Sequence, residues 1–333
     1  MELGEEGREK MMGTRIKVAV AQVAPIFLNR DATVKKICDW IARAGSEGAR
    51  WVVFPETVIP GYPYWLMTMP SMATGVINRE FFENSVIVPG AETDVLAVAT
   101  RDARCGVVIG VSERAGGTMY NSQLFFSPEG VLVGKRRKLM PTFHERMVWG
   151  RGDGTDLYAF DTSAGRVGGL ICYEHSNALF CYAMQSQREE IHFALWPGGM
   201  HWISNVVEAA SRNYAFQSQA FVASASSVMT PDILDWLSKH GGTGKFSIGG
   251  GHSCIVAPFG ELLAGPAPEG EVLLMSELDF DRITDRKIIT DCAGHYARPD
   301  VVRLLIERGQ QTPVVECPDT SSKRCADVRI ADA

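Results

Sequence analysis

A cysteine at the end of a predicted buried strand is the first residue in this sequence that could do chemistry. The apolar run at residues 167–171 predicts a strand that stops at Cys172, and the polar residues after it predict the start of a helix. Ligands of α/β sheets collect at the carboxyl ends of strands, where helix N-terminal amides can stabilise a thiolate. Cys172 is therefore a candidate nucleophile, and the simpler alternative is a core cysteine.

A carboxylate and an ammonium stand near the ends of two other predicted strands. Glu56 follows the short apolar strand at residues 51–54 almost directly, although an acid in such a loop is more often solvated. The basic run at residues 135–138 is also typical of a solvated face. Alternation along a strand, however, would turn Arg136 and Lys138 together to one side, so one of these cations could face a site.

The elements that must position these groups alternate between strands and helices. Apolar residues recur every three to four positions in the predicted helices and every two in the strands. A turn at residues 127–130 predicts an antiparallel hairpin, which favours a mixed sheet over a purely parallel one. The predicted strands are residues 15–24, 51–54, 107–111, 121–126, 131–134, 167–171, 192–196, 220–226, 253–257 and 272–278, and the predicted helices are residues 31–47, 93–105, 177–190, 204–219 and 300–307.

The second half of the chain carries two less regular segments. Residues 230–251 are rich in glycine and polar side chains and are interpreted as a surface insertion, and the last two strands are predicted to flank a hairpin-like turn at residues 258–260. We find no internal repeat and no linker between domains. The sequence therefore predicts a flexible N-terminus at residues 1–13, one α/β domain at 14–285 and a C-terminal tail at 286–333.

Composition favours an enzyme of small molecules. The 333 residues are 46% hydrophobic and 22% charged with a net charge of -6, which leaves no basic field for nucleic acid and no basic stretch for a membrane surface. No segment is apolar enough to span a bilayer. The eight cysteines form no Cys-x-x-Cys pair and the seven histidines show no zinc spacing, so we expect reduced thiols in the cytoplasm, no metal and no cofactor.

Four stretches of the chain resemble the nitrilase branch of the nitrilase superfamily, the carbon-nitrogen hydrolases. They are VVFPETVIPGYPYW from residue 52, KRRKLMPTFHERMVWGRGDG from residue 135, GGLICYEH from residue 168 and GHYARPD from residue 294. Each is a weak signal alone, but four in this order are specific. The resemblance covers roughly residues 17–305 and implies a four-layer αββα sandwich that dimerises to αββα-αββα and often extends to larger spirals. Separately, we expect the C-terminal tail to take part in oligomer contacts, and the alternative is that it is a flexible segment.

The resemblance also implies the roles of four site residues. It makes Cys172 the nucleophile, Glu56 the general base, Lys138 the cation and Glu145 the second acid. These types fit the chemistry, because a thiol with an ordinary pKa of about 8.5 is mostly protonated at neutral pH and needs a base. The nitrile nitrogen gains negative charge during attack and needs a cation or an acid. The implied reaction converts a nitrile to a carboxylic acid and ammonia through a thioimidate and a thioester.

Aromatic residues near these motifs are candidates for substrate binding. Tyr62 lies in the loop after Glu56, Tyr173 follows the nucleophile and Trp196 ends the next predicted strand, although core or interface packing would explain each of them equally well. Nitrilases commonly have tryptophan after the cysteine, whereas this chain has Tyr173. That departure leaves the preferred nitrile open, whether aliphatic, aryl or arylacetonitrile, together with the ratio of acid to amide.

Three alternatives remain from the sequence. An amidase, a carbamoylase or a cyanide hydratase would keep the same scaffold with another substrate. A thiol hydrolase would pair Cys172 with His175, but at helical spacing the ring points along the helix side and away from the thiol. A non-enzymatic assembly module would require the glutamate, lysine and cysteine at three strand ends to be incidental.

Overall fold

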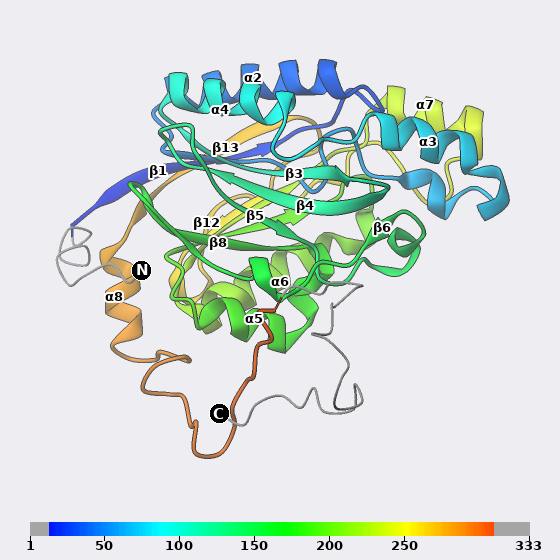
Figure 1. The fold of residues 1–333 in the computed structure, drawn as a ribbon. Coiled ribbons are helices and arrows are strands. Elements are labelled where there is room, and N and C mark those ends of the chain that lie inside the picture. The colour runs from blue at the N-terminus through cyan, green and yellow to red at the C-terminus, as the bar shows by residue number, and fades with distance from the viewer. Residues whose placement is uncertain (1–12, 310–333) are drawn as a thin grey trace, which may run out of the picture.

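Two β-sheets lie face to face between two layers of helices in the computed structural model (Figure 1). The structure describes residues 13–309. Helices α2 (Arg30–Ser46) and α4 (Ala91–Ala103) cover the outer face of one sheet, and α5 (Ala178–Gln185) and α6 (Ser204–Ser218) cover the outer face of the other. This arrangement is the αββα sandwich that the sequence predicts for one chain.

The first sheet mixes parallel and antiparallel strands. Its strands are β13 (Val272–Asp279), β1 (Arg15–Gln22), β2 (Trp51–Val53), β3 (Gly106–Ala115), β4 (Thr118–Phe126) and β5 (Leu132–Arg137) in spatial order, with β6 (Trp149–Gly150) paired to β4. The β1, β2 and β3 neighbours run parallel, whereas β13 and the hairpin strands β4 and β5 pair antiparallel. The predicted hairpin and the mixed sheet are thus confirmed.

The second sheet carries the nucleophile strand one position in from its edge. Its strands are β12 (Leu262–Ala264), β11 (Cys254–Val256), β10 (Phe221–Ser226), β9 (Ile191–Trp196), β8 (Gly165–Ile171) and β7 (Phe160–Thr162) in spatial order. The three central strands β8, β9 and β10 run parallel. Their carboxyl ends therefore lie along one edge, and Cys172 and Trp196 come at the ends of neighbouring strands.

Three hydrophobic cores hold the layers together. One fills the space between the sheets and includes Val53, Phe125, Phe193 and Leu195. The Gln123 side chain of β4 also lies there and donates to the backbone O of Phe193 at 3.0 Å. A second joins the first sheet to α2 and α4, and a third joins the second sheet to α5 and α6. Strands that are buried on both faces need continuous apolar runs, which explains why β2, β9 and β10 were recognisable in the sequence.

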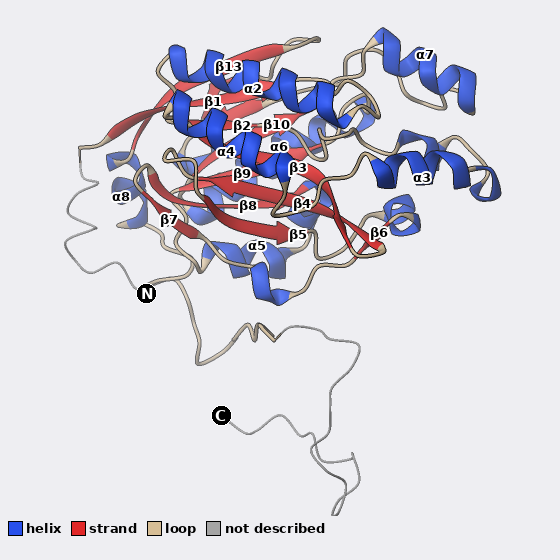
Figure 2. Cartoon of the chain, turned by 45° about the horizontal axis from the view of Figure 1, so that its top comes forward, coloured by secondary structure: helices blue, strands red, loops and turns tan. Residues whose placement is uncertain are grey.

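Some predicted elements were wrong. The segment interpreted as an irregular insertion contains helix α7 (Pro231–His240), which begins at a Thr230 cap and buries Ile233 and Leu237 one turn apart. Helix α3 (Gly75–Glu83) was also missed, and the helix predicted at residues 177–190 ends at Gln185. Figure 2 shows α3 and α7 side by side at one end of the molecule.

The chain after β11 also differs from the prediction. β11 forms its hairpin with β12, whereas β13 crosses to the other sheet and pairs with β1, so the last two predicted strands do not flank one turn. No helix forms at residues 300–307, and the last helix within residues 13–309 is α8 (Asp281–Lys287). Residues 1–12 of the flexible N-terminus predicted at 1–13, and the part of the tail after residue 309, lie outside the described residues.

Candidate active site

An ammonium between two carboxylates forms the centre of the site. The Nζ of Lys138 lies 2.8 Å from Glu56 Oε1 and 2.8 Å from Glu145 Oε2. All three side chains are at most 1% exposed. Unpaired charges are rarely found at such depth, because desolvation costs several kcal/mol per ion. The lysine is therefore the group that allows two acids to lie next to each other inside the protein.

Local chain geometry brings each of these groups to the same place. Glu56 follows β2, and Lys138 follows β5 at the end of a hairpin. Glu145 lies in the 3-10 helix at Phe143–Met147, and the Thr142 backbone N–H donates to its Oε2 at 2.8 Å. A Cβ on Gly110 would come within 2.7 Å of the Glu56 Cα, so only glycine lets strand β3 pass under this loop.

The two carboxylates have different partners. Glu56 Oε1 accepts from Asn121 Nδ2 at 2.6 Å and from Lys138, whereas its Oε2 is buried and has no hydrogen-bond partner. Glu145 accepts from the Tyr62 hydroxyl at 2.9 Å as well as from Lys138 and Thr142. A buried acceptor without a partner is rare in native proteins and is often kept for function. Glu56 Oε2 is the oxygen still able to take a proton.

The Cys172 thiol is buried and lies on a strained turn. Its φ of 52° places a non-glycine residue in the left-handed region, at a cost of roughly 1–2 kcal/mol. Burial, followed by the charge of Glu56, raises the pKa of this thiol well above its ordinary value. Lys138 and a hydrogen bond from the Tyr173 backbone N–H oppose that rise. The sulfur is thus close enough to Glu56, Lys138 and Glu145 to interact electrostatically with all three.

The same environment shifts the pKa values of Glu56 and Lys138. Burial, reinforced by Glu145 and opposed by Lys138, raises the pKa of Glu56 to about 7. Burial alone would lower the pKa of Lys138, but Glu145 and Glu56 outweigh it and raise that pKa above its ordinary value. The lysine therefore stays charged at neutral pH, while Glu56 can both accept and release a proton.

A buried ion pair connects the lysine strand to the cysteine turn. Arg136 binds Glu174 through two bonds of 2.7 and 2.9 Å, and both side chains are at most 1% exposed. Glu174 also accepts from the backbone N–H groups of Ile171 and Leu139. These groups flank Cys172 and Lys138, so one carboxylate sets the position of both site residues. The predicted alternation is confirmed, because Arg136 and Lys138 are buried together.

The histidine next to the cysteine does not contact the thiol. His175 Nδ1 lies 2.8 Å from the backbone carbonyl O of Cys172, and its Nε2 lies 3.0 Å from His192. The ring stacks on Trp196 with centroids 5.2 Å apart. The helical spacing argument is thus confirmed, and a cysteine-histidine pair of the thiol hydrolase type has no support here.

The three predicted substrate-binding aromatics lie in different environments. Tyr62 is buried and contacts Glu145 through its hydroxyl. Tyr173 is 37% exposed, and Trp196 is fully buried with no hydrogen-bond partner for its Nε1. Tyr62 therefore contacts a charged site residue through its side chain, whereas Trp196 contacts Glu56 through its backbone carbonyl, which accepts from the Glu56 N–H at 3.3 Å. The contribution of all three aromatic residues to substrate binding stays a prediction.

Comparison with known proteins gives the family. A model of the carbon-nitrogen hydrolase family matches residues 17–288. The chain belongs to the carbon-nitrogen hydrolase family. A protein named Nitrilase 3 from an unknown prokaryotic organism is 41% identical over 298 residues, which cover 88% of this chain and 90% of that protein. A nitrilase of Paraburkholderia phymatum is 38% identical over 94% of this chain and 93% of its own length.

The fold is that of solved carbon-nitrogen hydrolases. The structure of a carbon-nitrogen hydrolase from Helicobacter pylori G27 superposes with a TM-score of 0.70 at 20% identity, covering 86% of this chain and 97% of the other. At this identity the likeness shows the fold alone. It confirms the α/β fold of two mixed sheets. The family match and the relatives named nitrilase place this protein among enzymes that hydrolyse carbon–nitrogen bonds.

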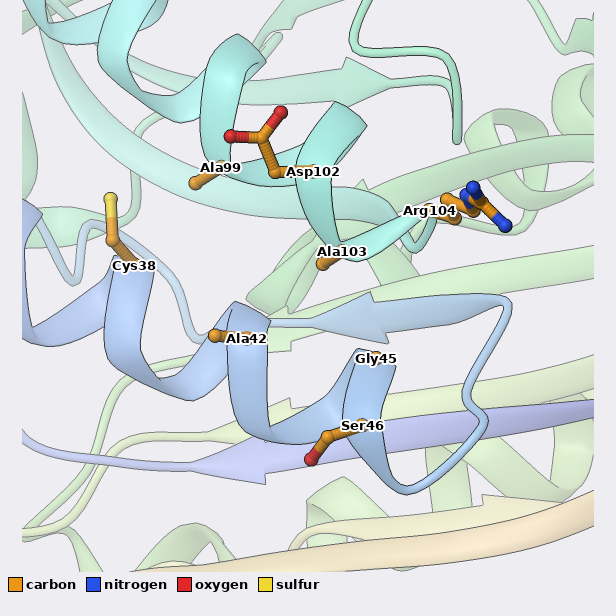
Figure 3. Close-up of a pocket in the computed structure, with 8 residues that line it drawn as sticks. All are labelled: Cys38, Ala42, Gly45, Ser46, Ala99, Asp102, Ala103 and Arg104. Carbon is orange, nitrogen blue, oxygen red and sulfur yellow. The ribbon is translucent and has the colours of Figure 1, made fainter.

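Other features lie outside the charged site. A depression between α2 and α4, lined by residues such as Cys38, Gly45 and Arg104, is on the outer helical layer and contains no site residue (Figure 3). Among residues 13–309, no group of three or more histidine, cysteine, aspartate or glutamate side chains is arranged to hold a metal ion. Within the same residues, no helix is long and apolar enough to cross a membrane.

Sequence reasoning missed the residues that support the four main groups. Asn121, Glu174 and Thr142 were not predicted as site residues, although the sequence held a signal for Asn121 and Glu174. Asn121 begins the predicted hairpin strand opposite Lys138, and the register of that hairpin brings the two together. Glu174 lies two residues after the candidate nucleophile. Its buried partner Arg136 is 38 positions away, so no local pattern indicated the pair.

Proposed function

We propose that this protein is a nitrilase that hydrolyses a nitrile to a carboxylic acid and ammonia with Cys172 as the nucleophile. The observation that carries this proposal is the buried Lys138 between Glu56 and Glu145, with Glu56 Oε2 left without a partner. Such a set supplies a base for the thiol and a cation for the charge that develops on the substrate nitrogen. The named relatives support the nitrile as the substrate class.

The first stage forms a covalent thioimidate. Glu56 Oε2 accepts the thiol proton as the Cys172 sulfur attacks the nitrile carbon, and that proton then passes to the substrate nitrogen. Lys138 stabilises the negative charge on this nitrogen during the attack. This step needs no oxidant or reductant, because the new C–S bond replaces one bond of the nitrile triple bond.

Two water molecules complete the reaction. The first adds to the thioimidate carbon and gives a tetrahedral intermediate, which loses ammonia and leaves a thioester. The second attacks the thioester carbon as Glu56 takes its proton, with Glu145 and Tyr62 orienting the groups around Lys138. The carboxylic acid leaves, and the proton returns to the Cys172 sulfur, which restores the thiol.

A substrate panel tests the reaction class. Purified protein is incubated with aliphatic nitriles, aryl nitriles, arylacetonitriles, amides, carbamoyl compounds and cyanide, and ammonia, acid and amide are measured. We expect ammonia and acid in equal amounts from at least one nitrile class. Turnover of amides or carbamoyl compounds alone, or of cyanide to formamide alone, would assign the scaffold to the corresponding alternative. No turnover of any compound would favour the assembly module.

Two cysteine variants test the nucleophile. Cys172→Ala is expected to abolish acid formation while the protein keeps its fold, because the removed atom is the one that bonds to substrate. Cys38→Ala is the matched control, since Cys38 is half-buried on α2 and contacts no site residue. A mass increase equal to the acyl group on Cys172, trapped by acid quenching, is expected in the parent protein and in Cys38→Ala but not in Cys172→Ala.

The proposal also includes an oligomeric state and a cellular location. The family resemblance points to a homodimer or a larger spiral, and exposed apolar side chains on the α5 and α6 side, Leu179 and Phe216, support a partner surface. The tail at residues 286–333 is expected to join these contacts. Size-exclusion chromatography of a chain ending at Arg308 tests its contribution. A cytoplasmic location would keep the Cys172 thiol reduced, as the reaction requires.

A further inference from the structure

A row of buried polar side chains lies behind the cysteine turn and takes no part in the steps above. His175 Nδ1 lies 2.8 Å from the Cys172 carbonyl O, and His175 Nε2 lies 3.0 Å from His192 Nε2. His192 Nδ1 lies 2.9 Å from Glu189 Oε2, which also accepts from the Tyr214 hydroxyl at 2.5 Å. We call His175, His192, Glu189 and Tyr214 the histidine row. All four side chains are buried.

The hydrogen bonds of this row leave only one arrangement of protons on His175. A carbonyl oxygen can only accept, so the Nδ1 of His175 carries a hydrogen. Burial, reinforced by His192, lowers the pKa of His175 to about 3, so its ring is neutral and its Nε2 accepts. The Nε2 of His192 must then donate. Glu174 and Arg136 also act on His175, but their charges oppose each other.

At the far end of the row, Glu189 and Tyr214 keep His192 as the donor to His175. His192 already donates through Nε2, and a hydrogen must also lie between its Nδ1 and Glu189, because two acceptors would repel each other. One further proton is therefore shared by this buried pair, and the Tyr214 hydroxyl donates to the same carboxyl group. His192 stacks on the Tyr214 ring with centroids 3.6 Å apart, which fixes its orientation.

At its near end, the row contacts the Cys172–Tyr173 peptide through His175. The carbonyl of the Cys172–Tyr173 peptide accepts from His175, and the N–H of the same peptide bonds the Cys172 sulfur. A donor at the oxygen of a peptide polarises it and strengthens its N–H as a donor. The turn itself is strained at Cys172, so the peptide also needs a contact that holds its orientation.

We infer that His175, kept as its Nδ1–H tautomer by the buried His192–Glu189 pair, is a positioning residue that orients and polarises the Cys172–Tyr173 peptide and so controls the reactivity of the Cys172 sulfur. This inference rests on the proposed function only for the identity of the nucleophile. The sulfur's reactivity can be measured without any nitrile, so the two proposals can fail separately.

Alkylation of Cys172 by iodoacetamide, measured by mass spectrometry across pH, gives the first test. His175→Phe keeps a ring against Trp196 but removes the donor, and we expect alkylation at pH 7 to slow by about tenfold with the thiol titration moved to higher pH. His175→Asn places an amide donor near the position of Nδ1, and we expect it to recover most of the rate. Equal rates in the parent and the phenylalanine variant would overturn the inference.

Nitrile turnover by the same variants separates positioning from loss of fold. We expect the phenylalanine variant to lower kcat with little change in KM, while its thermal midpoint and that of the asparagine variant fall together. A rate that follows the thermal midpoint, with no difference between the two variants, would show a purely structural role. Absence of nitrile hydrolysis in the parent protein would instead contradict the proposed function and leave the alkylation result intact.

The tautomer can be read in the parent protein, so the test does not depend on a variant that folds. Nitrogen-15 NMR of histidine-labelled protein at pH 7 distinguishes a protonated ring nitrogen from a bare one. We expect His175 to be neutral with hydrogen on Nδ1 and none on Nε2. A charged His175 ring, or hydrogen on Nε2 alone, would overturn the inference.

Discussion

Lys138 and Glu56 lie 2.8 Å apart and have no exposed side-chain surface, although they are 82 residues apart in the chain. Removing one member of such a buried pair is strongly destabilising, because the other charge is left without a partner. The same ammonium also contacts Glu145, so one cation serves two acids.

Removing the ammonium is expected to damage both activity and stability. Lys138→Met leaves two buried carboxyl groups without a counter-charge, which we expect to cost about 3–5 kcal/mol of unfolding free energy at neutral pH. Without Lys138, which lowers the pKa of Glu56, this carboxyl group would hold its proton more tightly in the folded state than in the unfolded state, so the loss is expected to be larger at pH 8 than at pH 5. Urea unfolding at the two pH values measures this difference.

The control for this prediction is Lys239→Met on α7. Lys239 is exposed, so its replacement is expected to change the unfolding free energy by less than about 0.5 kcal/mol at either pH. A Lys138 variant as stable as this control would contradict the buried arrangement.

The rate is expected to fall on the acid side of neutral pH. Glu56 must be ionised to accept the thiol proton, and its pKa is raised to about 7, mainly by burial. We therefore expect kcat/KM to fall as pH drops through 7, by close to tenfold per pH unit below it. Asn121→Val removes a hydrogen bond that lowers this pKa and is expected to move the acid limb to higher pH. A flat profile down to pH 5 would exclude Glu56 as the base.

The Arg136–Glu174 pair is expected to show strong coupling in a double-mutant cycle. Arg136→Met leaves a buried carboxylate and is expected to cost about 3–5 kcal/mol, whereas the double variant with Glu174→Leu is expected to lose much less than the sum of the single variants. Urea unfolding of the four proteins gives the coupling energy. Additive losses would mean that the pair does not act as a unit.

This pair also predicts an acid dependence of stability. Burial works to raise the pKa of Glu174, but Arg136 and the backbone donors outweigh it, and the pKa lies below the ordinary 4.5. A carboxyl group with a depressed folded-state pKa contributes stability above the unfolded-state value, and that stability is lost as pH falls below about 4.5. We expect unfolding free energy to decline through this range in the parent protein and less steeply in the double variant.

A glycine under the Glu56 loop is expected to be essential for activity. In Gly110→Ala the new Cβ would lie 2.5 Å from the Pro55 carbonyl O and the Thr57 N, so the loop that carries Glu56 must move. Displacement of a catalytic group by about 1 Å can cost on the order of 100-fold in rate. Gly117→Ala is the matched control, because nothing lies within 4 Å of its added Cβ. Equal nitrile turnover by the two variants would show that the loop tolerates the shift.

Local sequence patterns were sufficient to predict the helices and strands whose signals lie in neighbouring residues. The buried strands β2, β8 and β9 each stand out as apolar runs that stop at a polar group or a turn, which placed Glu56 and Cys172 at strand ends. Helix α7 had its signal too, since Thr230 caps it, Pro231 begins it and Ile233 and Leu237 are one turn apart. The glycine-rich residues that follow concealed this short amphipathic pattern.

Pairing between distant segments could not be predicted from local sequence patterns. Strand β13 joins β1 although their paired residues, from Gln22 with Val272 to Arg15 with Asp279, are far apart in the chain, and the partner of Glu174 comes from another sheet. The amino-acid sequence by itself determined which residue types stand at the strand ends, because burial and turn formation depend on near neighbours. Only the tertiary structure decided which buried charge meets which, and that Glu56 Oε2 is left without a partner, because those contacts depend on how the two sheets pack.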